Sequence, residues 1–219
     1  MVTNQNINYP LAIYKSLMVY NKAQISTFIL CDNLYHLNTY RWNLSYLLNN
    51  KNNKMFQSYH NITYKSDIKD IKYKYCSFFT CKFIGITISG SDFSHSKFIN
   101  CVFVNCTIDK SNFRLINLIN CEIKDCKITN TDFTGSILNK SKITSCNIHT
   151  CNFTNNHYTD AIIDNINYNG CKFNGSDFGI NMDLTTCTFD FCSMTIFTGK
   201  PLLSEKALVT VYPSPWVIT

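Results

Sequence analysis

Large apolar side chains stand at every fifth position from Ile68 to Phe178, without an exception. A period of five matches neither the 3.6-residue turn of an α-helix nor the two-residue alternation of a β-strand. The chain must therefore return the same side to its interior by turning at regular intervals, as repeat proteins do. We call these positions the centres: Ile68, Tyr73, Phe78, Phe83, Ile88, Phe93, Phe98, Phe103, Ile108, Phe113, Leu118, Ile123, Ile128, Phe133, Leu138, Ile143, Ile148, Phe153, Tyr158, Ile163, Tyr168, Phe173 and Phe178.

A second order appears at an interval of twenty residues. Most positions two before a centre hold a small residue, and residues of one type recur twenty apart, as with Phe93 and Phe113 or Cys101 and Cys121. This is expected if four pentapeptides make one square coil and successive coils lie about 4.8 Å apart, the spacing of strands in a sheet. Gly and Asn are frequent two residues after a centre, as at Gly85, where a tight turn requires a positive φ.

The order of a small residue, then Asp or Asn, then Leu or Phe resembles the pentapeptide-repeat family. The match is closest in Ser91-Asp92-Phe93, Ser111-Asn112-Phe113, Thr131-Asp132-Phe133 and Ser176-Asp177-Phe178. The resemblance covers about 130 of the 219 residues. It implies an all-β fold, a right-handed quadrilateral β-helix. In that fold the centres and small residues point inward and the other three positions point outward.

We expect three parts in the chain. Residues 66–198 form the repeat, with a one-residue slip of phase near Ile180 and Asn181 that predicts a bulge. Residues 1–65 form a non-repeat, partly helical cap, with helices expected over 11–20 and 39–48, and residues 199–219 form a short C-terminal cap. Caps are expected because the open ends of a coil leave strand edges unpaired.

Twelve cysteines raise the question of metal or redox chemistry. Eleven of them occupy the inward small position, Cys31 being the exception, and no Cys-x2-Cys knuckle occurs. Zinc sites normally combine such knuckles with further ligands. We therefore expect buried, reduced thiols that act as small apolar residues, without a metal or a cofactor, and an intracellular location.

Sequence motifs of catalysis do not occur. His95, His149 and His157 fall on outward positions in different columns, and there is no Gly-rich phosphate loop, nucleophile elbow or His-Glu-x-x-His. No apolar run has the length of a membrane span or of the core of a secretory signal. We expect a soluble cytoplasmic protein that is not an enzyme, with delivery into a host cell as an alternative.

Several outward positions are apolar in the first coils only. They form columns at the interval of twenty and turn polar farther along the chain. Contiguous apolar patches usually mark contacts, so these residues are candidates for an interaction site. The alternative is that the N-terminal segment folds back over them. The candidates are Phe79, Ile84, Ile99, Val102, Val104, Leu115 and Ile119.

The C-terminal segment contains enough apolar residues to form a homodimer through that end of the coil. Members of the family often dimerise there, which is what the resemblance implies for this chain. The candidate residues are Leu202, Leu203, Leu208, Val209, Val211, Trp216 and Val217.

Charge is unevenly distributed along the chain and separates the candidate functions. Residues 66–198 hold twelve basic and twelve acidic residues, whereas residues 1–65 hold six Lys or Arg and one Asp. The resemblance implies binding to DNA gyrase or topoisomerase IV by DNA mimicry, as in quinolone or microcin resistance, but mimicry of phosphates needs a negative surface. We therefore favour an interaction scaffold for a protein partner, such as a bacterial effector. A further alternative is nucleic-acid binding through the basic N-terminal segment.

Overall fold

The computed structural model describes residues 52–180, 182–195, 198–199, 201–203 and 209–212, the last of these for their backbone only. Two compact units are distinguished, Met1–Asn53 and Lys54–Thr219, and the second unit holds the coil. The helices expected over 11–20 and 39–48 lie outside the described residues.

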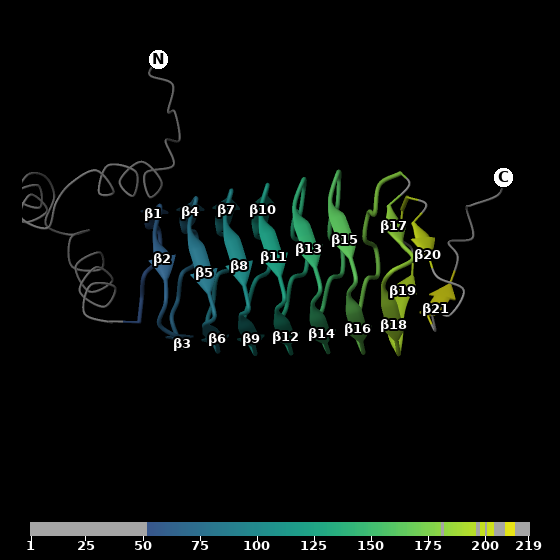
Figure 1. Ribbon diagram of the computed structural model, residues 1–219, viewed down its shortest axis with the longest axis horizontal. Helices are drawn as coiled ribbons and strands as arrows, with labels where there is room; N and C mark the ends of the chain where they lie inside the picture. Colours follow the sequence, from purple (N-terminus) through teal and green to yellow (C-terminus); the bar gives the residue numbers. More distant parts are fainter. Residues whose placement is uncertain (1–51, 181, 196–197, 200, 204–208, 213–219) are drawn as a thin grey trace, which may run out of the picture. The chain divides into compact units, whose positions relative to one another are not determined.

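Short parallel strands build three faces of a four-sided coil (Figure 1). Face 1 consists of β1 (Ser58–His60), β4 (Ser77–Phe79), β7 (Lys97–Ile99) and β10 (Asn117–Ile119). Face 2 consists of β2 (Thr63–Tyr64), β5 (Lys82–Ile84), β8 (Val102–Val104), β11 (Glu122–Lys124), β13 (Lys142–Thr144) and β15 (Ile162–Asp164). Face 3 consists of β3 (Ile68–Lys69), β6 (Thr87–Ser89), β9 (Thr107–Asp109), β12 (Lys127–Thr129), β14 (Asn147–His149), β16 (Asn167–Asn169) and β18 (Thr188–Asp190).

Face 4 is held by isolated parallel bridges that connect one coil to the next. The first of them joins Lys72 to Asp92 and the last joins Lys172 to Ser193. Face 1 continues beyond β10 in the same way, through bridges that end at Asp177 and Thr198. The whole described repeat is thus a parallel β-solenoid, as the period of five predicts.

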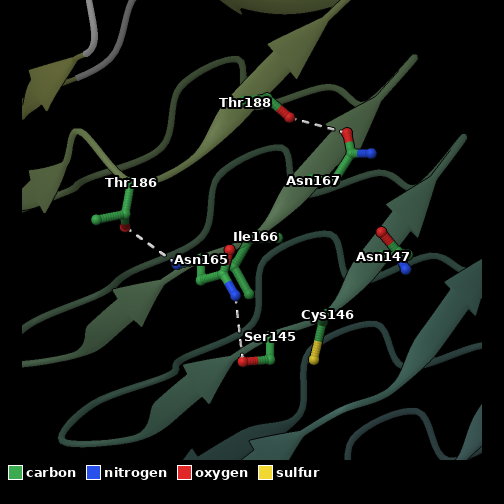
Figure 2. Close-up of a pocket in the computed structure, with 8 residues that line it drawn as sticks. All are labelled: Ser145, Cys146, Asn147, Asn165, Ile166, Asn167, Thr186 and Thr188. Carbon is green, nitrogen blue, oxygen red and sulfur yellow. Dashed lines mark hydrogen bonds between the residues drawn. The ribbon is translucent and has the colours of Figure 1, made fainter.

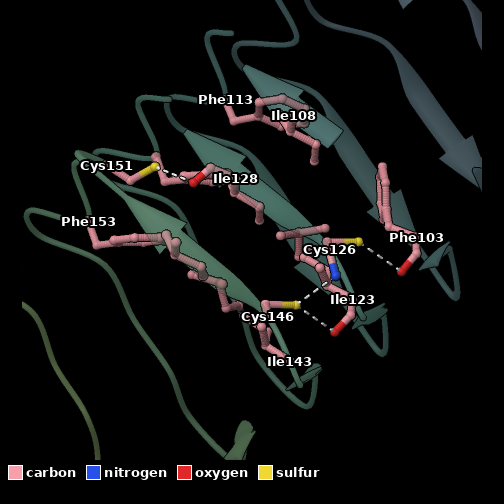
Figure 3. Packing of buried hydrophobic residues seen from close by; sticks show 14 of the residues in the cluster. Phe103, Ile108, Phe113, Ile123, Cys126, Ile128, Ile143, Cys146, Cys151 and Phe153 are labelled. Atoms are coloured by element: carbon pink, nitrogen blue, oxygen red, sulfur yellow. Dashed lines mark hydrogen bonds between the residues drawn. The ribbon is translucent and has the colours of Figure 1, made fainter. Parts of the chain in front are cut away.

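The centres form a continuous core. All twenty-three from Ile68 to Phe178 are buried, which confirms the inward direction assigned to them. Figure 3 shows how equivalent positions of the coils lie over one another, for example Ile108 and Ile128 of successive coils, and Phe113 and Phe153 of coils two turns apart. The rings of Phe133 and Phe153 stack in parallel with their centroids 5.1 Å apart.

The small inward residues have a second role besides packing. Cys126 Sγ donates a hydrogen bond to Phe103 O at 3.6 Å (Figure 3). Ser96 Oγ likewise donates to Tyr73 O at 2.6 Å. In both cases the acceptor is a carbonyl of the preceding coil. Cys and Ser therefore serve the same purpose at this position: each is small enough for the interior and satisfies a buried carbonyl.

Strand register shows where the coil departs from twenty residues per turn. Phe78 pairs with Phe98, at the regular interval, whereas Tyr168 pairs with Phe189 across twenty-one residues. This interval contains one residue more than a regular turn, and the sequence predicts a slip of phase within it, near Ile180 and Asn181. Ile180 is 87% exposed, as expected for a residue that bulges out of the corner.

A second irregularity at the other end is not evident from the centres alone. Tyr59 pairs with Phe78 and Tyr64 with Phe83, in both cases across nineteen residues. Both tyrosines stack on the phenylalanine of the next coil, at 4.9 Å and 4.5 Å. The strands thus begin at Ser58, and backbone hydrogen bonds to the next coil begin earlier still, where the Lys54 N–H donates to Lys72 O at 2.8 Å. Both precede the expected start of the repeat at Ser66.

The C-terminal segment adds strands to the coil. β20 (Leu202–Leu203) pairs with β17 (Asp183–Leu184), and β21 (Val209–Tyr212) pairs with β19 (Cys192–Thr195), both in parallel. Leu203 is partly buried and packs against the core. These strands continue the stacking of coils, so this part of the expected C-terminal cap has the architecture of the repeat itself.

We predict that the corner at Ile180 tolerates deletion and that a corner inside the coil does not. Deleting Ile180 restores the interval of twenty and should change the melting temperature by only a few degrees. Deleting Asn130, which is also an exposed corner residue, would displace every later centre by one position and turn the core outward. Circular dichroism melting of the two variants checks this, and equal losses in both would contradict it.

Candidate functional site

Outward positions on the coil form straight columns because the strands are paired in register. In each three-residue strand the first and third side chains point outward, and a corner residue with positive φ follows one residue later. Residues of one column therefore lie one strand spacing apart, about 4.8 Å. This geometry brings together residues that are twenty apart in the sequence.

The first predicted column lies on face 1. Phe79 pairs with Ile99, and Ile99 pairs with Ile119, as the sequence predicts. The column extends by one residue toward the N-terminus, where the ring of His60 stacks on that of Phe79 at 4.7 Å. Phe79, Ile99 and Ile119 are each partly buried, because each is covered above and below by its neighbours in the column.

The second predicted column lies on face 2. Ile84 pairs with Val104, and Val102 is in the same strand as Val104, on the other side of the inward Phe103. Ile84 is 43% exposed, whereas the two valines are partly buried. The two apolar columns therefore lie on adjoining faces.

Leu115 belongs to a third column, which the sequence interpretation did not identify. It occupies the corner between faces 4 and 1, where Tyr75 and His95 precede it in the two coils below. Tyr75 stacks on Phe56 at 5.0 Å and on His95 at 4.9 Å, with nearly parallel rings. The signal in the sequence is the recurrence of Tyr, His and Leu at turn positions, where the coil elsewhere often has Gly or Asn.

The backbone at this corner is unusual for such large residues. Tyr75 has a φ of 57° and Leu115 a φ of 55°, while their side chains are 44% and 46% exposed. Bulky residues in the left-handed region are outliers that cost of the order of 1 kcal/mol or more. Tyr75 is held by its stacking on Phe56 and His95, whereas neither the backbone nor burial favours Leu115 at this corner. Because Leu115 adjoins the column of face 1, it is a candidate for a contact outside the coil.

The boundary at which the three columns cease to be apolar spans about one turn of the coil, and the column of face 2 reaches it first. After Leu115 comes Gly135, after Ile119 comes Asn139, and after Val104 comes Lys124. A side chain at Gly135 would meet Leu115 Cδ2 at 2.8 Å, so the glycine leaves room for this leucine. We call the residues before this boundary the apolar surface: Tyr75, His95, Leu115, Phe79, Ile99, Ile119, Ile84, Val102 and Val104.

Charges on faces 1 and 2 are one-sided beside this surface. The segments 58–65, 77–85 and 97–105 contain Lys65, Lys82 and Lys97 and no Asp or Glu. None of these lysines has an ion pair among the described residues. In the same coils, the carboxylates nearest in sequence are on faces 3 and 4, as with Asp70 and Asp92.

Over the whole coil, no face is acidic. Within residues 66–198, with each corner included in the face before it, face 1 has two basic and two acidic residues. Faces 2 and 3 have three basic and four acidic residues each, and face 4 has four basic and two acidic residues. The coil has no net formal charge, and none of its four faces is strongly negative.

The buried cysteines form the most conspicuous set of reactive groups. All eleven described cysteines are buried and free. Burial raises the pKa of the Cys76 thiol to about 11, and burial also raises that of Cys187. Cys101 differs, because a hydrogen bond from Cys121 lowers its pKa. In the described part of the chain, no three His, Cys, Asp or Glu residues are grouped so as to hold a metal ion.

One histidine does meet a carboxylate. His157 Nδ1 lies 3.9 Å from Asp177 Oδ2, and Thr198 is bridged to Asp177 from the next coil. The Gly179 N–H donates to Asp177 Oδ1 at 3.0 Å and lowers the pKa of this carboxyl. In a hydrolytic triad the histidine lies between nucleophile and carboxylate. Here the carboxylate is in the middle, so the arrangement does not fit that chemistry.

A shallow hollow of about 270 Å³ lies at the corner between faces 2 and 3 (Figure 2). Asn165 Nδ2 donates to Ser145 Oγ, and Thr188 Oγ1 donates to Asn167 Oδ1. These bonds occupy part of the polar lining, and no Asp, Glu, Lys, Arg or His lines the hollow. The hollow therefore offers neutral hydrogen-bonding groups and no acid–base pair.

The predicted dimer residues are only partly within the described region. Leu202 is 54% exposed and Leu203 is partly buried, whereas Val209 and Val211 are placed by their backbone in β21. Leu208, Trp216 and Val217 lie outside the described residues. The homodimer stays a proposal.

The pentapeptide register and the square parallel coil define a class of protein. Residues 76–153 match the model of the pentapeptide repeat region. The chain therefore contains a pentapeptide-repeat region, as its sequence motifs predict. Among the described residues, no helix is long and apolar enough to cross a membrane.

Similarity to individual proteins is low. No curated protein matches the chain in sequence. The pentapeptide repeat protein HetL, involved in heterocyst differentiation regulation in the cyanobacterium Nostoc sp., is 12% identical over 77% of this chain and 94% of its own, with a TM-score of 0.44. QnrB1, a plasmid-mediated fluoroquinolone resistance protein, is 16% identical over 74% of this chain and 93% of its own, with a TM-score of 0.36. At these values neither likeness assigns a function.

Proposed function

We propose that the protein is a non-enzymatic interaction scaffold that binds a protein partner through the apolar surface. The observation that supports this most is that all three columns cease to be apolar part-way along the coil, within one turn of one another. Packing of the interior does not require such a boundary, because the same kinds of centres continue to Phe178. A contact confined to the first turns of the coil accounts for it.

Affinity capture with matched variants tests the proposal. Ile99→Asp places a charge in the face 1 column within the apolar surface. Thr159→Asp makes the same change at the same column position in the polar part of the coil. Proteins captured by the wild type and by Thr159→Asp, and lost with Ile99→Asp, would support the scaffold. The same captured set with all three, at equal melting temperatures, would contradict it.

Binding to gyrase or topoisomerase IV by DNA mimicry is the alternative that the family resemblance implies. DNA-like recognition depends mainly on a negative field, and no face of the coil has an excess of more than one acidic residue. We expect no inhibition of gyrase supercoiling, and no protection from a quinolone, at micromolar protein. Inhibition would favour the mimic over the scaffold. The alternative of nucleic-acid binding through residues 1–65 rests largely on residues outside the described region.

A further inference from the structure

We infer that the partner of the apolar surface is an acidic protein segment that also carries large apolar side chains. This inference rests on the proposed scaffold function and adds the chemistry of the partner. Two properties of faces 1 and 2 lead to it: the apolar columns themselves and the lysines that lie among them without carboxylates.

The lysines are placed to contact whatever covers the columns. Lys82 is in the same strand as Ile84, and Lys97 is in the same strand as Ile99, each on the other side of an inward phenylalanine. Both lysines are exposed and neither has an ion pair in the described structure. An occupant without negative charge would leave two cations beside an apolar contact, whereas carboxylates would pair with them at the rim.

The sign of the charge changes where the apolar columns end. The column of Lys82 continues through Val102 to Glu122, next to the polar Lys124. Asp125 follows at the next corner. Carboxylates thus enter face 2 at the same level at which its apolar column stops. On face 2, an acidic partner would be attracted by Lys82 and repelled by Glu122 and Asp125, which lie in the same turn as Ile119.

Ring geometry separates this partner from a nucleic acid. Single-stranded nucleic acids are held by bases that stack on open aromatic faces. Tyr75 is stacked between Phe56 and His95, with interplanar angles of 3° and 15°, and Phe79 is stacked on His60. The two faces of the Tyr75 ring are occupied within the column, so mainly its edge is offered to a partner. Such edges suit apolar side chains of a protein.

Selection from a random peptide-display library on the full-length chain tests the inference. We expect the enriched peptides to contain both Asp or Glu and large apolar residues. The consensus peptide should bind the Lys82→Glu/Lys97→Glu variant about tenfold more weakly than the wild type. Lys142→Glu is the matched control, since Lys142 occupies the same column as Lys82 in the polar part of the coil. Its affinity should equal that of the wild type.

Leu115→Asn is a variant in which the peptide affinity should fall while the stability does not. Asn tolerates the positive φ at this corner better than Leu does, so the melting temperature should be maintained or raised while the peptide affinity falls. Phe191→Asn makes the same kind of change at another corner, where Phe191 has a φ of 54° and is 86% exposed. This control should retain the affinity of the wild type.

Three outcomes would overturn the inference. Enrichment of uncharged apolar peptides that bind the double lysine variant normally, but not Ile99→Asp, would remove the acidic partner and leave the scaffold function in place. Absence of any enriched peptide would overturn the inference, while the capture experiment still decides the scaffold function. Binding of oligo-dT or of phosphatidylserine vesicles that is lost in the double lysine variant would identify a nucleic acid or a membrane as the occupant.

Discussion

Replacing Phe98 with Ala should lower the free energy of unfolding by about 3–5 kcal/mol. Phe98 is fully buried, and its ring stacks in parallel on that of Phe78 with the centroids 4.7 Å apart. The ring of Phe103 lies 5.6 Å away in the adjoining layer. Truncation removes this packing and leaves a cavity that the coil cannot close, because the paired strands on both sides fix the spacing of the layers.

Phe191→Ala is the control for this prediction. Phe191 is 86% exposed at a corner, so its truncation should change the stability by no more than about 0.5 kcal/mol. Urea unfolding followed by circular dichroism measures both variants, with the slope of the transition showing whether unfolding stays cooperative. Similar losses in the two variants would contradict the assignment of the centres as the core.

Stability should decrease steeply as the pH rises from about 9 to about 11. Burial raises the pKa of Cys76 from 9.0 to about 11, and burial also raises the pKa of Cys187. Below pH 9 these thiols are protonated in the folded and unfolded chains, so their contribution to stability is fully present. Above pH 9 the unfolded chain releases protons that the folded chain retains, which favours unfolding by about 1.4 kcal/mol per pH unit for each such thiol.

Cys76→Ser isolates one of these protons. Ser96 occupies the equivalent position in the next coil, and its Oγ donates to a carbonyl of the preceding coil, so Ser is compatible with this environment. The variant should show a shallower alkaline decrease than the wild type, because Ser does not titrate in this range. Urea unfolding at pH 7, 9, 10 and 11 with a reductant present measures it. An unchanged slope in the variant, or constant stability from pH 7 to 11, would contradict the prediction.

Part of the apolar surface can be predicted from the sequence alone. The columns of Phe79 and Ile84 follow from the interval of twenty, since that interval is a property of the chain. The sequence also marks Leu115 as apolar and outward. Its place at the far edge of face 1, above Tyr75 and His95, depends on the geometry of the corner and on the stacking of the rings there.

The ends of the coil are not predicted by the sequence period alone. Tyr59 and Tyr64 are five residues apart but out of phase with Ile68, so the period alone does not join them to the repeat. Strand pairing with Phe78 and Phe83 places them in it, at an interval of nineteen residues instead of twenty. The C-terminal strands β20 and β21 are likewise fixed by pairing and not by a repeat in the sequence.

The fold, the buried positions and the class of this protein can all be predicted from its amino-acid sequence. The reason is that a period of five is local and uninterrupted, and each pentapeptide can bury its centre in only one way. The strand register establishes which outward residues share a surface, and that in the first coils Lys65, Lys82 and Lys97 lie on other faces than the carboxylates of Asp70 and Asp92. Outward side chains do not constrain the coil, so their meaning depends on which columns the strand register places side by side.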